Sequence, residues 1–266
     1  MYLDHWHLKH FPFDNVGNPA YFFETEAVRL ALRDLEDAID RRKGAVLLTG
    51  EIGCGKTTLI EHFLHGLVDT RHDIAFITYP CLEPLEMLRE INLQLGLDSD
   101  GPDRNALLHA LQQHLANNAA SGRDTLICID EAQSIPSITT FEELRLLLNF
   151  KIPERFLLTL MFVGQPELQK KINKLPQLKQ RISLRLHLGP LSEQDAPEYM
   201  LHRLDAAGSE RCILTRQAVD SVYRHTRGVP RRINHLADRC LMEGMRLNAG
   251  LLDSRLVNET MKTYSC

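Results

Sequence analysis

One short stretch, residues 50–58, restricts the fold of this chain more than any other part of the sequence. It reads Gly-Glu-Ile-Gly-Cys-Gly-Lys-Thr-Thr and fits the pattern Gly-x-x-x-x-Gly-Lys-[Ser/Thr]. An apolar run of strand type precedes it at residues 45–48, and apolar residues at helical spacing follow it at residues 59–67. A strand, a glycine-rich loop and a helix in this order turn backbone N–H groups toward an anion at the helix N-terminus. The stretch therefore predicts a loop that binds the phosphates of a nucleotide.

The residue types in this loop predict a division of tasks. Lys56 is expected to reach the β- and γ-phosphates of ATP as a compact charge, and the Thr57 hydroxyl is expected to bind Mg²⁺. Cys54 stands out, because a thiol at a helix N-terminus can be activated and placed under redox control; a tolerated small side chain is the favoured interpretation. The other positions expected to bind the nucleotide are Gly50, Glu51, Ile52, Gly53, Gly55 and Thr58.

A pair of carboxylates, Asp130 and Glu131, ends the apolar run at residues 125–129, about seventy residues after the loop. Asp130 is expected to lie in the outer coordination sphere of Mg²⁺ or to ligate it through water. Glu131 is expected to orient and polarise the water that attacks the γ-phosphate. Helix N-caps also place acids at strand ends, so the pair alone is a weak signal. Its distance from the glycine-rich loop favours a site that hydrolyses ATP.

A polar residue follows the next buried strand-type run. Residues 156–163 are apolar and lead directly into Gly164, Gln165 and Pro166. Ligands of open α/β sheets bind beyond the carboxyl ends of the strands. Gln165 is therefore expected to sense the γ-phosphate or to help place the attacking water, and a turn residue without such a contact is the alternative.

Strand-type runs alternate with helical segments up to about residue 190, and helical segments alone follow. This alternation predicts an α/β fold of the P-loop NTPase type, with a doubly wound parallel sheet of five strands followed by a small all-helical domain. The strands are expected at residues 45–48, 74–78, 125–129, 156–163 and 183–188. The expected organisation is an N-terminal aromatic arm and first helix packed on the core (1–43), a nucleotide-binding domain (44–190) and a helical lid domain (191–266).

The composition argues against several classes of protein. The chain has 266 residues and a formal net charge of −4, so it has no overall basic field for gripping nucleic acid. Its six cysteines are scattered without a Cys-x-x-Cys pair, which is typical of reduced thiols and not of a disulfide framework or zinc site. No apolar run approaches the ~18 residues that span a bilayer, and the N-terminus lacks the regions of a signal peptide. The sequence predicts a cytoplasmic protein that reaches the inner membrane only through a partner.

Several segments together resemble the AAA+ class and, within it, the ATPase domain of the general secretion pathway protein A family (GspA/ExeA). The resemblance covers nearly the whole chain, and its most specific segments are Gly-Gln-Pro-Glu-Leu at 164–168 and Gly-Val-Pro-Arg-Arg-Ile-Asn at 228–234. Membrane-bound members continue into a transmembrane helix and a peptidoglycan-binding domain. This chain ends after the lid segments, so it resembles either an excised domain or the stand-alone ATPases encoded with mannose-sensitive haemagglutinin pili or exopolysaccharide export. The other matching segments are 12–13, 48–58, 129–133 and 180–182.

The resemblance also implies roles for arginines that no spacing rule would identify. Arg181 matches the position of an arginine finger, which would complete the site of a neighbouring subunit and imply a ring-type homo-oligomer. Arg185, four residues later, is its rival for this role. Arg231 matches the lid arginine that contacts the γ-phosphate, with Arg232 beside it as the alternative.

Three functions remain open from the sequence. The first is a Mg²⁺-dependent ATPase that assembles or remodels a bacterial secretion, pilus or polysaccharide export apparatus, with an envelope component as its partner. The second is a DNA-linked ATPase of the transposition or replication-initiation type, for which Arg227, Arg231, Arg232 and Arg239 could form a basic face. The third is a nucleotide-dependent binding switch with little turnover.

Overall fold

The chain folds into two compact units. The computed structural model describes residues 1–15, 18–67, 71–99, 103–153 and 155–263; Cys266 and the end of the turn expected at 96–102 lie outside this part. The sheet unit comprises Glu26–Glu51 and Leu59–Leu188. The helical unit comprises Met1–Thr25, Ile52–Thr58 and Gly189–Cys266. Within the described ranges, no helix has both the length and the apolar character needed to cross a membrane.

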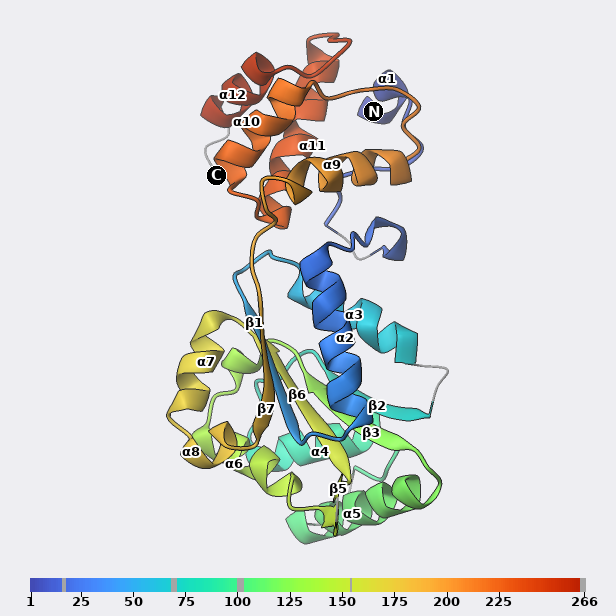
Figure 1. Cartoon of the computed structure of the whole chain (residues 1–266), viewed down its shortest axis with the longest axis vertical. Helices are drawn as coiled ribbons and strands as arrows, with labels where there is room; N and C mark the ends of the chain where they lie inside the picture. Colours follow the sequence, from blue (N-terminus) through green and yellow to red (C-terminus); the bar gives the residue numbers. More distant parts are fainter. Residues whose placement is uncertain (16–17, 68–70, 100–102, 154, 264–266) are drawn as a thin grey trace. The chain divides into compact units, whose positions relative to one another are not determined.

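The main sheet of the sheet unit contains five strands, and every pair of neighbours in it runs parallel (Figure 1). The strand order is β2-β3-β6-β1-β7, so β1 lies inside the sheet and the chain extends the sheet on both of its sides. This order confirms the doubly wound parallel sheet of five strands that the sequence predicts. The strands are β1 (Ala45–Gly50), β2 (His72–Ile77), β3 (Asp124–Ile129), β6 (Leu158–Gly164) and β7 (Ile182–Leu188).

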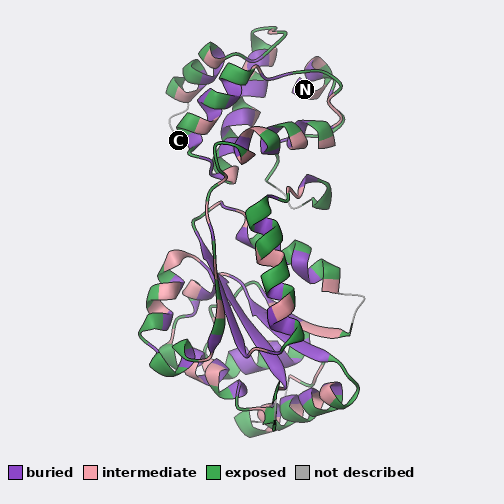
Figure 2. Ribbon diagram, in the orientation of Figure 1, coloured by how far each residue is buried: buried purple, intermediate pink, exposed green. Residues whose placement is uncertain are grey.

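The three inner strands are buried along their whole length, as Figure 2 shows. Leu47 and Leu160 belong to an apolar cluster with residues of α4 to α8. Their chain neighbours Val46 and Met161 are equally buried. These two residues lie outside that cluster. Side chains alternate across a strand, so they point to the opposite face, where α2 contacts β3 and β7. The helices are α2 (Glu26–Asp40), α3 (Lys56–Leu67), α4 (Pro84–Gln94), α5 (Arg104–Ala120), α6 (Ile138–Leu147), α7 (Pro166–Asn173) and α8 (Pro176–Lys179).

The predicted start of the fourth strand is wrong. The run at residues 156–163 was expected to form a single strand, but β6 begins at Leu158. Phe156 instead belongs to β5 (Arg155–Phe156), which pairs antiparallel with β4 (Lys151–Ile152). Hydrophobicity alone could not separate Phe156 from the run that follows it, because both are apolar and the separation depends on which partner strand is within hydrogen-bonding reach.

The sequence predicts one short helix after Gln165 and Pro166 that ends near Arg181, but the structure has two helices there. α7 ends at Asn173, and Pro176 begins α8. A proline is well placed at the first position of a helix but disfavours helical geometry in the residue before it, so the break coincides with Leu175. The apolar spacing after Phe141 predicts a helix from that residue. α6 begins three residues earlier, because Ser137 caps its N-terminus by accepting from the Thr139 N–H at 3.1 Å.

The helical unit is built from four lid helices and the N-terminal arm. The arm was expected to pack on the protein core, and its buried aromatic residues lie in the apolar cluster of the lid helices. Trp6 is fully buried there, and its Nε1 donates a hydrogen bond to the Leu241 carbonyl at 2.9 Å. The elements are α1 (Tyr2–Trp6), a 3₁₀ turn (Pro19–Tyr21), α9 (Asp195–Ala206), α10 (Arg216–Thr226), α11 (Pro230–Arg246) and α12 (Ser254–Thr263).

A buried arginine fastens the rest of the arm to α9. Arg203 is 6% exposed, and its guanidinium donates to the backbone carbonyls of Pro12 and Asp14. The same guanidinium lies 4.3 Å from the centre of the Tyr21 ring. A buried cation needs such partners, because its desolvation is otherwise costly. The segment around Pro12 therefore has a structural role in the helical unit. The sequence analysis identified residues 12–13 only as a segment that matches the family.

Gly244 on α11 leaves room for Trp6, and this predicts a measurable overpacking effect. A Cβ at Gly244 would lie 2.6 Å from both Trp6 Cζ2 and Leu252 Cδ2. Because the indole is held by its hydrogen bond, Gly244→Ala should destabilise the helical unit by about 1–3 kcal/mol. Urea unfolding followed by the fluorescence of Trp6, the single tryptophan of the sequence, measures this. Gly250→Ala is the matched control, because its Cβ meets no described atom within 4 Å; equal stabilities would contradict the prediction.

Candidate functional site

Three predicted site residues lie at the same edge of the sheet, each directly after the end of a strand. β6 pairs in parallel with both β1 and β3, so the carboxyl ends of these strands lie together. The residues that follow them are Glu51, Asp130 and Gln165. The structure thus brings together three positions that are spread over more than one hundred residues of the sequence, at the edge where parallel sheets bind ligands.

The loop has glycine at several positions for different physical reasons. A Cβ on Gly50 would lie 2.3 Å from the Leu188 carbonyl oxygen, so the close approach of β1 and β7 excludes a side chain. Gly53 and Gly55 have φ values of 83° and 92°, in the left-handed region that favours glycine. A Cβ on Gly55 would meet no described heavy atom within 4 Å, so the backbone there borders open space.

This loop fits the phosphates of a nucleotide. Lys56 is the first residue of α3, so the N–H groups of the first helical turn and the positive end of the helix dipole lie where the loop ends. Open space beside Gly55 and a lysine at the helix start are what a polyphosphate requires. Cys54 is buried within the loop.

The donor types also fit Mg²⁺. The Thr57 hydroxyl and the Asp130 carboxylate are hard oxygen ligands, which this cation prefers. Among the residues that the structure describes, no group of three or more His, Cys, Asp or Glu side chains could hold a metal ion. When bound, Mg²⁺ would neutralise the charge that develops on the phosphates.

The loop is joined to the lid helix α11 within the helical unit. The Arg231 N–H donates to the Gly53 carbonyl at 3.2 Å, and a Cβ on Gly53 would lie 2.8 Å from Arg231 Cβ. Arg231 is the second residue of α11, after Pro230, so this hydrogen bond satisfies one of the N–H groups that a helix start leaves unpaired. Arg232 lies next to it, and both side chains are exposed.

The acidic pair has a strained backbone. Glu131 has a φ of 49°, which is unusual for a residue with a side chain and is typical of functional sites. Its N–H donates to Asp130 Oδ1 at 2.8 Å, and the Asp130 N–H donates to the Ile77 carbonyl at 2.9 Å. Asp130 is therefore placed by the end of β2, while its hydrogen bond helps Glu131 to keep its left-handed conformation.

A residue that the sequence analysis did not single out, Gln133, contacts both predicted catalytic residues of this edge. Its Nε2 donates to Glu131 Oε2, and its Oε1 accepts from the Gln165 N–H at 3.0 Å. Gln165 Nε2 also lies 3.4 Å from Glu131 Oε2. The sequence offered one signal, which is that Gln133 is a polar residue two positions after Glu131 at the end of a buried strand. Only the fold shows that its amide reaches both Glu131 and Gln165.

A buried thiol precedes the acidic pair on β3. Burial raises the pKa of Cys128 well above its usual range, and the nearby Asp130 acts in the same direction. This cysteine is therefore an uncharged packing residue at neutral pH, not a nucleophile.

The two candidate arginine fingers lie elsewhere in the sheet unit. Arg181 directly precedes β7, whose start pairs with the start of β1, so it lies at the amino edge of the sheet. Its guanidinium is 5.7 Å from the centre of the Phe156 ring. Arg185 is exposed within β7 and donates to the Lys179 carbonyl at 3.1 Å. A strand of seven residues spans ~20 Å, so Arg181 does not reach Glu131 of its own chain.

The chain matches the family described as AAA domain over residues 39–172, which include the glycine-rich loop, the acidic pair and Gln165. It belongs to this family. It is also 38% identical over 247 residues to general secretion pathway protein A of Aeromonas hydrophila. That alignment covers 91% of this chain and 44% of the relative, so the chain spans less than half the length of the protein it resembles. The comparison thus supports the resemblance to the GspA family that the segments at 164–168 and 228–234 of the chain predicted.

Solved structures support the fold. The ORC2 protein of Aeropyrum pernix, solved as ADPNP-ADP complexes, superposes with a TM-score of 0.69 at 18% identity over 96% of this chain and 71% of its own. Drosophila ORC bound to DNA gives a TM-score of 0.71 at 18% identity over 94% of this chain and 63% of its own. At these identities the likeness shows a shared P-loop NTPase fold.

Proposed function

We propose that this chain is a Mg²⁺-dependent ATPase that drives the assembly or remodelling of a bacterial secretion apparatus, including related pilus and polysaccharide export systems. The observation that carries the proposal is the arrangement at the carboxyl edge of the sheet. There Glu131 stands in a left-handed backbone conformation with its carboxylate held by amide donors, next to the strand end from which the glycine-rich loop departs. The relationship to general secretion pathway protein A supports an envelope component as the partner.

The residues divide the reaction among them. Lys56 and the loop N–H groups bind the phosphates, and Thr57 with Asp130 provides oxygen ligands for Mg²⁺. Glu131 orients the attacking water and draws on its proton, while Gln165 contacts the γ-phosphate or the water. Arg231 on α11 senses the γ-phosphate, and its N–H bond to Gly53 gives lid movement a direct connection to the phosphate loop.

The position of Arg181 supports an oligomer as the active species. It lies at the sheet edge opposite to Glu131, so it acts on another copy if it acts in catalysis. A finger supplied by a neighbouring subunit contributes about 10³–10⁵ in rate in related phosphoryl transfer reactions. A ring-type homo-oligomer that forms on nucleotide binding is the assembly we infer, with Arg185 as the second candidate for this role.

The binding half of this proposal is tested by removing the loop cation. Lys56→Ala should weaken ATP binding by about 100-fold, because charge-assisted hydrogen bonds to the phosphates are lost. Titration calorimetry with a non-hydrolysable ATP analogue measures the dissociation constant. Lys43→Ala is the control, since this lysine contacts Asp37 on α2 away from the loop. Equal affinities of wild type and Lys56→Ala would remove Lys56 from the site.

A DNA-linked ATPase is the second candidate, and one observation favours it. Arg227, Arg231, Arg232 and Arg239 are all exposed around the end of α10 and along the first turns of α11. Nucleic-acid binding by such a face would stimulate turnover and fall steeply as salt rises. ATPase assays with and without duplex DNA at two salt concentrations decide between the candidates, and a wild type without turnover under every condition would favour a nucleotide-dependent switch.

A further inference from the structure

The amide of Gln133 is engaged at both ends. Its Nε2 donates to the carboxylate of Glu131, and its Oε1 accepts from the backbone N–H of Gln165. A planar amide transmits displacement, because its oxygen and nitrogen cannot move independently. A change in the position of the Gln165 backbone therefore displaces the Gln133 amide as a rigid group, and this displaces its hydrogen bond to the Glu131 carboxylate.

The backbone around Gln133 is held by the helix that follows Gln165. Lys171 on α7 donates from Nζ to the carbonyls of Gln133 at 2.6 Å and Ile135 at 2.9 Å. Gln165 is the N-cap residue of the same helix. The loop after β3 and the loop after β6 are thus joined by hydrogen bonds from the side chains of Gln133 and Lys171. A shift of α7 would therefore strain these hydrogen bonds.

Gly164 makes space for this arrangement. A Cβ at position 164 would lie 2.4 Å from Gln133 Oε1 and 2.9 Å from Leu168 Cδ2. The φ of Gly164 is not in the left-handed region, so its backbone conformation does not require glycine. The missing side chain is explained by the close approach of the Gln133 amide.

We propose that Gln133 is a positioning residue that sets the orientation of the Glu131 carboxylate and couples it to the position of Gln165. The inference rests on the proposed ATPase function, in which Glu131 polarises the attacking water and Gln165 responds to the γ-phosphate. In this arrangement the orientation of Glu131, the proton acceptor, depends on the position of Gln165, the phosphate sensor. A nucleotide that moves Gln165 therefore also changes the orientation of the Glu131 carboxylate. Gln133 itself touches neither water nor phosphate in this role.

The first test removes the amide while keeping its volume. Gln133→Met should lower kcat by about 5- to 20-fold, because one charge-assisted and one neutral hydrogen bond are lost, and should leave KM and nucleotide affinity unchanged. Gln113→Met on the exposed surface of α5 is the matched control and should retain wild-type kcat. A Gln133→Met enzyme with wild-type kcat, or with a loss confined to KM, would overturn the inference.

The second test uses Gly164 and a double-mutant cycle. Gly164→Ala should lower kcat as Gln133→Met does, because the added methyl displaces the amide. In a Gln133→Ala background, the same Gly164→Ala change should lower kcat much less, since the oxygen that it would strike is gone and only the 2.9 Å approach to Leu168 Cδ2 remains. Independent, multiplicative losses in the double variant would show that Gly164 acts by another route and would contradict the coupling.

A readout without turnover separates this inference from the proposed function. The Gln165 N–H loses its acceptor in Gln133→Met, so its hydrogen exchange, followed by NMR or mass spectrometry, should become at least several-fold faster. Unchanged exchange would overturn the link even in an active enzyme. A wild type that binds ATP without hydrolysing it would contradict the ATPase proposal, whereas faster exchange in the variant would still establish the link between the two loops.

Discussion

Replacing Glu131 with glutamine is expected to leave ATP binding intact and to lower turnover by about 10²- to 10⁴-fold. Glutamine has the same shape, and its carbonyl oxygen can still accept from Gln133 Nε2 and Gln165 Nε2, so the local structure should persist. What the amide lacks is the negative charge and the basicity that draw a proton from the attacking water. The loss should therefore appear in kcat, with little change in the affinity for a non-hydrolysable analogue.

Phosphate release and calorimetry on the same preparations test this prediction. Glu167→Gln is the matched control, because Glu167 is an exposed acid in the first turn of α7 at the same sheet edge and contacts none of the predicted site residues in the described structure. It should keep wild-type kcat. Substantial turnover in Glu131→Gln would assign the water to another group, and lost binding would assign Glu131 to the nucleotide instead.

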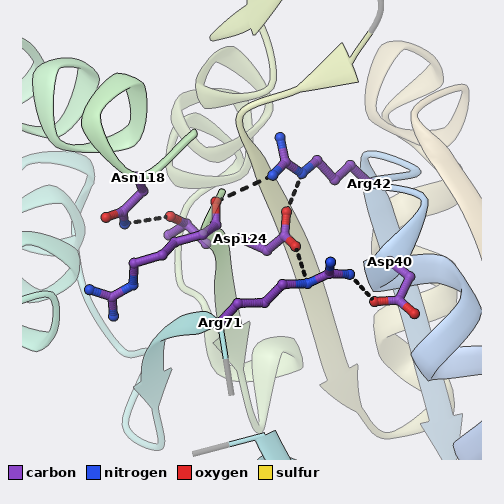
Figure 3. Close-up of polar contacts among 7 residues, drawn as sticks. Asp40, Arg42, Arg71, Asn118 and Asp124 are labelled. Carbon is purple, nitrogen blue, oxygen red and sulfur yellow. Dashed lines mark hydrogen bonds and ion pairs between the residues drawn. The ribbon is translucent and has the colours of Figure 1, made fainter. Parts of the chain in front are cut away.

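Asp124→Asn is expected to destabilise the sheet unit by about 3–5 kcal/mol. Asp124 begins β3 and is 6% exposed, and it accepts from the Nε of Arg42, a residue that is 8% exposed (Figure 3). It also pairs with Arg71 at 3.2 Å, and Arg71 in turn contacts Asp40 at 2.8 Å. Asparagine keeps the size of the side chain but removes its charge, so the Arg42 cation stays buried without a counter-ion.

The measurement must report on the sheet, and Trp6 cannot, because it lies in the helical unit. Cys128 is fully buried on β3, so its alkylation in rising urea, resolved by peptide mass spectrometry, reports the opening of that strand. Glu26→Gln is the control, since the Glu26–Arg29 pair on α2 is exposed and such pairs contribute at most about 1 kcal/mol.

A double variant separates charge burial from packing. If the cost of Asp124→Asn comes from an unpaired cation, then Arg42→Met in the same chain should recover part of the stability, because replacing both charges by neutral groups removes the penalty. Additive losses would show that the two residues act independently. A loss below about 1 kcal/mol for Asp124→Asn alone would mean that water reaches Arg42 and replaces the carboxylate.

The elements of the sheet unit were largely predictable because their patterns are local. Apolar runs ending in polar residues located the strands at 45–48 and 125–129, and the glycine-rich loop with its flanks identified the P-loop fold. Boundaries were less predictable. Phe156 is as apolar as its neighbours, and its place in a separate hairpin depends on pairing with Lys151.

What the sequence alone could predict was a nucleotide site at residues 50–58 and its acidic partner, since these chemistries depend on residue type and short spacing. Only the tertiary structure decided which side chains meet. Asp124 and Arg42 are 82 positions apart, and Gln133 and Gln165 are 32 apart, so no local pattern links either pair. Contacts between distant segments arise from strand order, and strand order follows from the packing of the whole sheet. For that reason the residues that contact the Glu131 carboxylate could be found only in the fold.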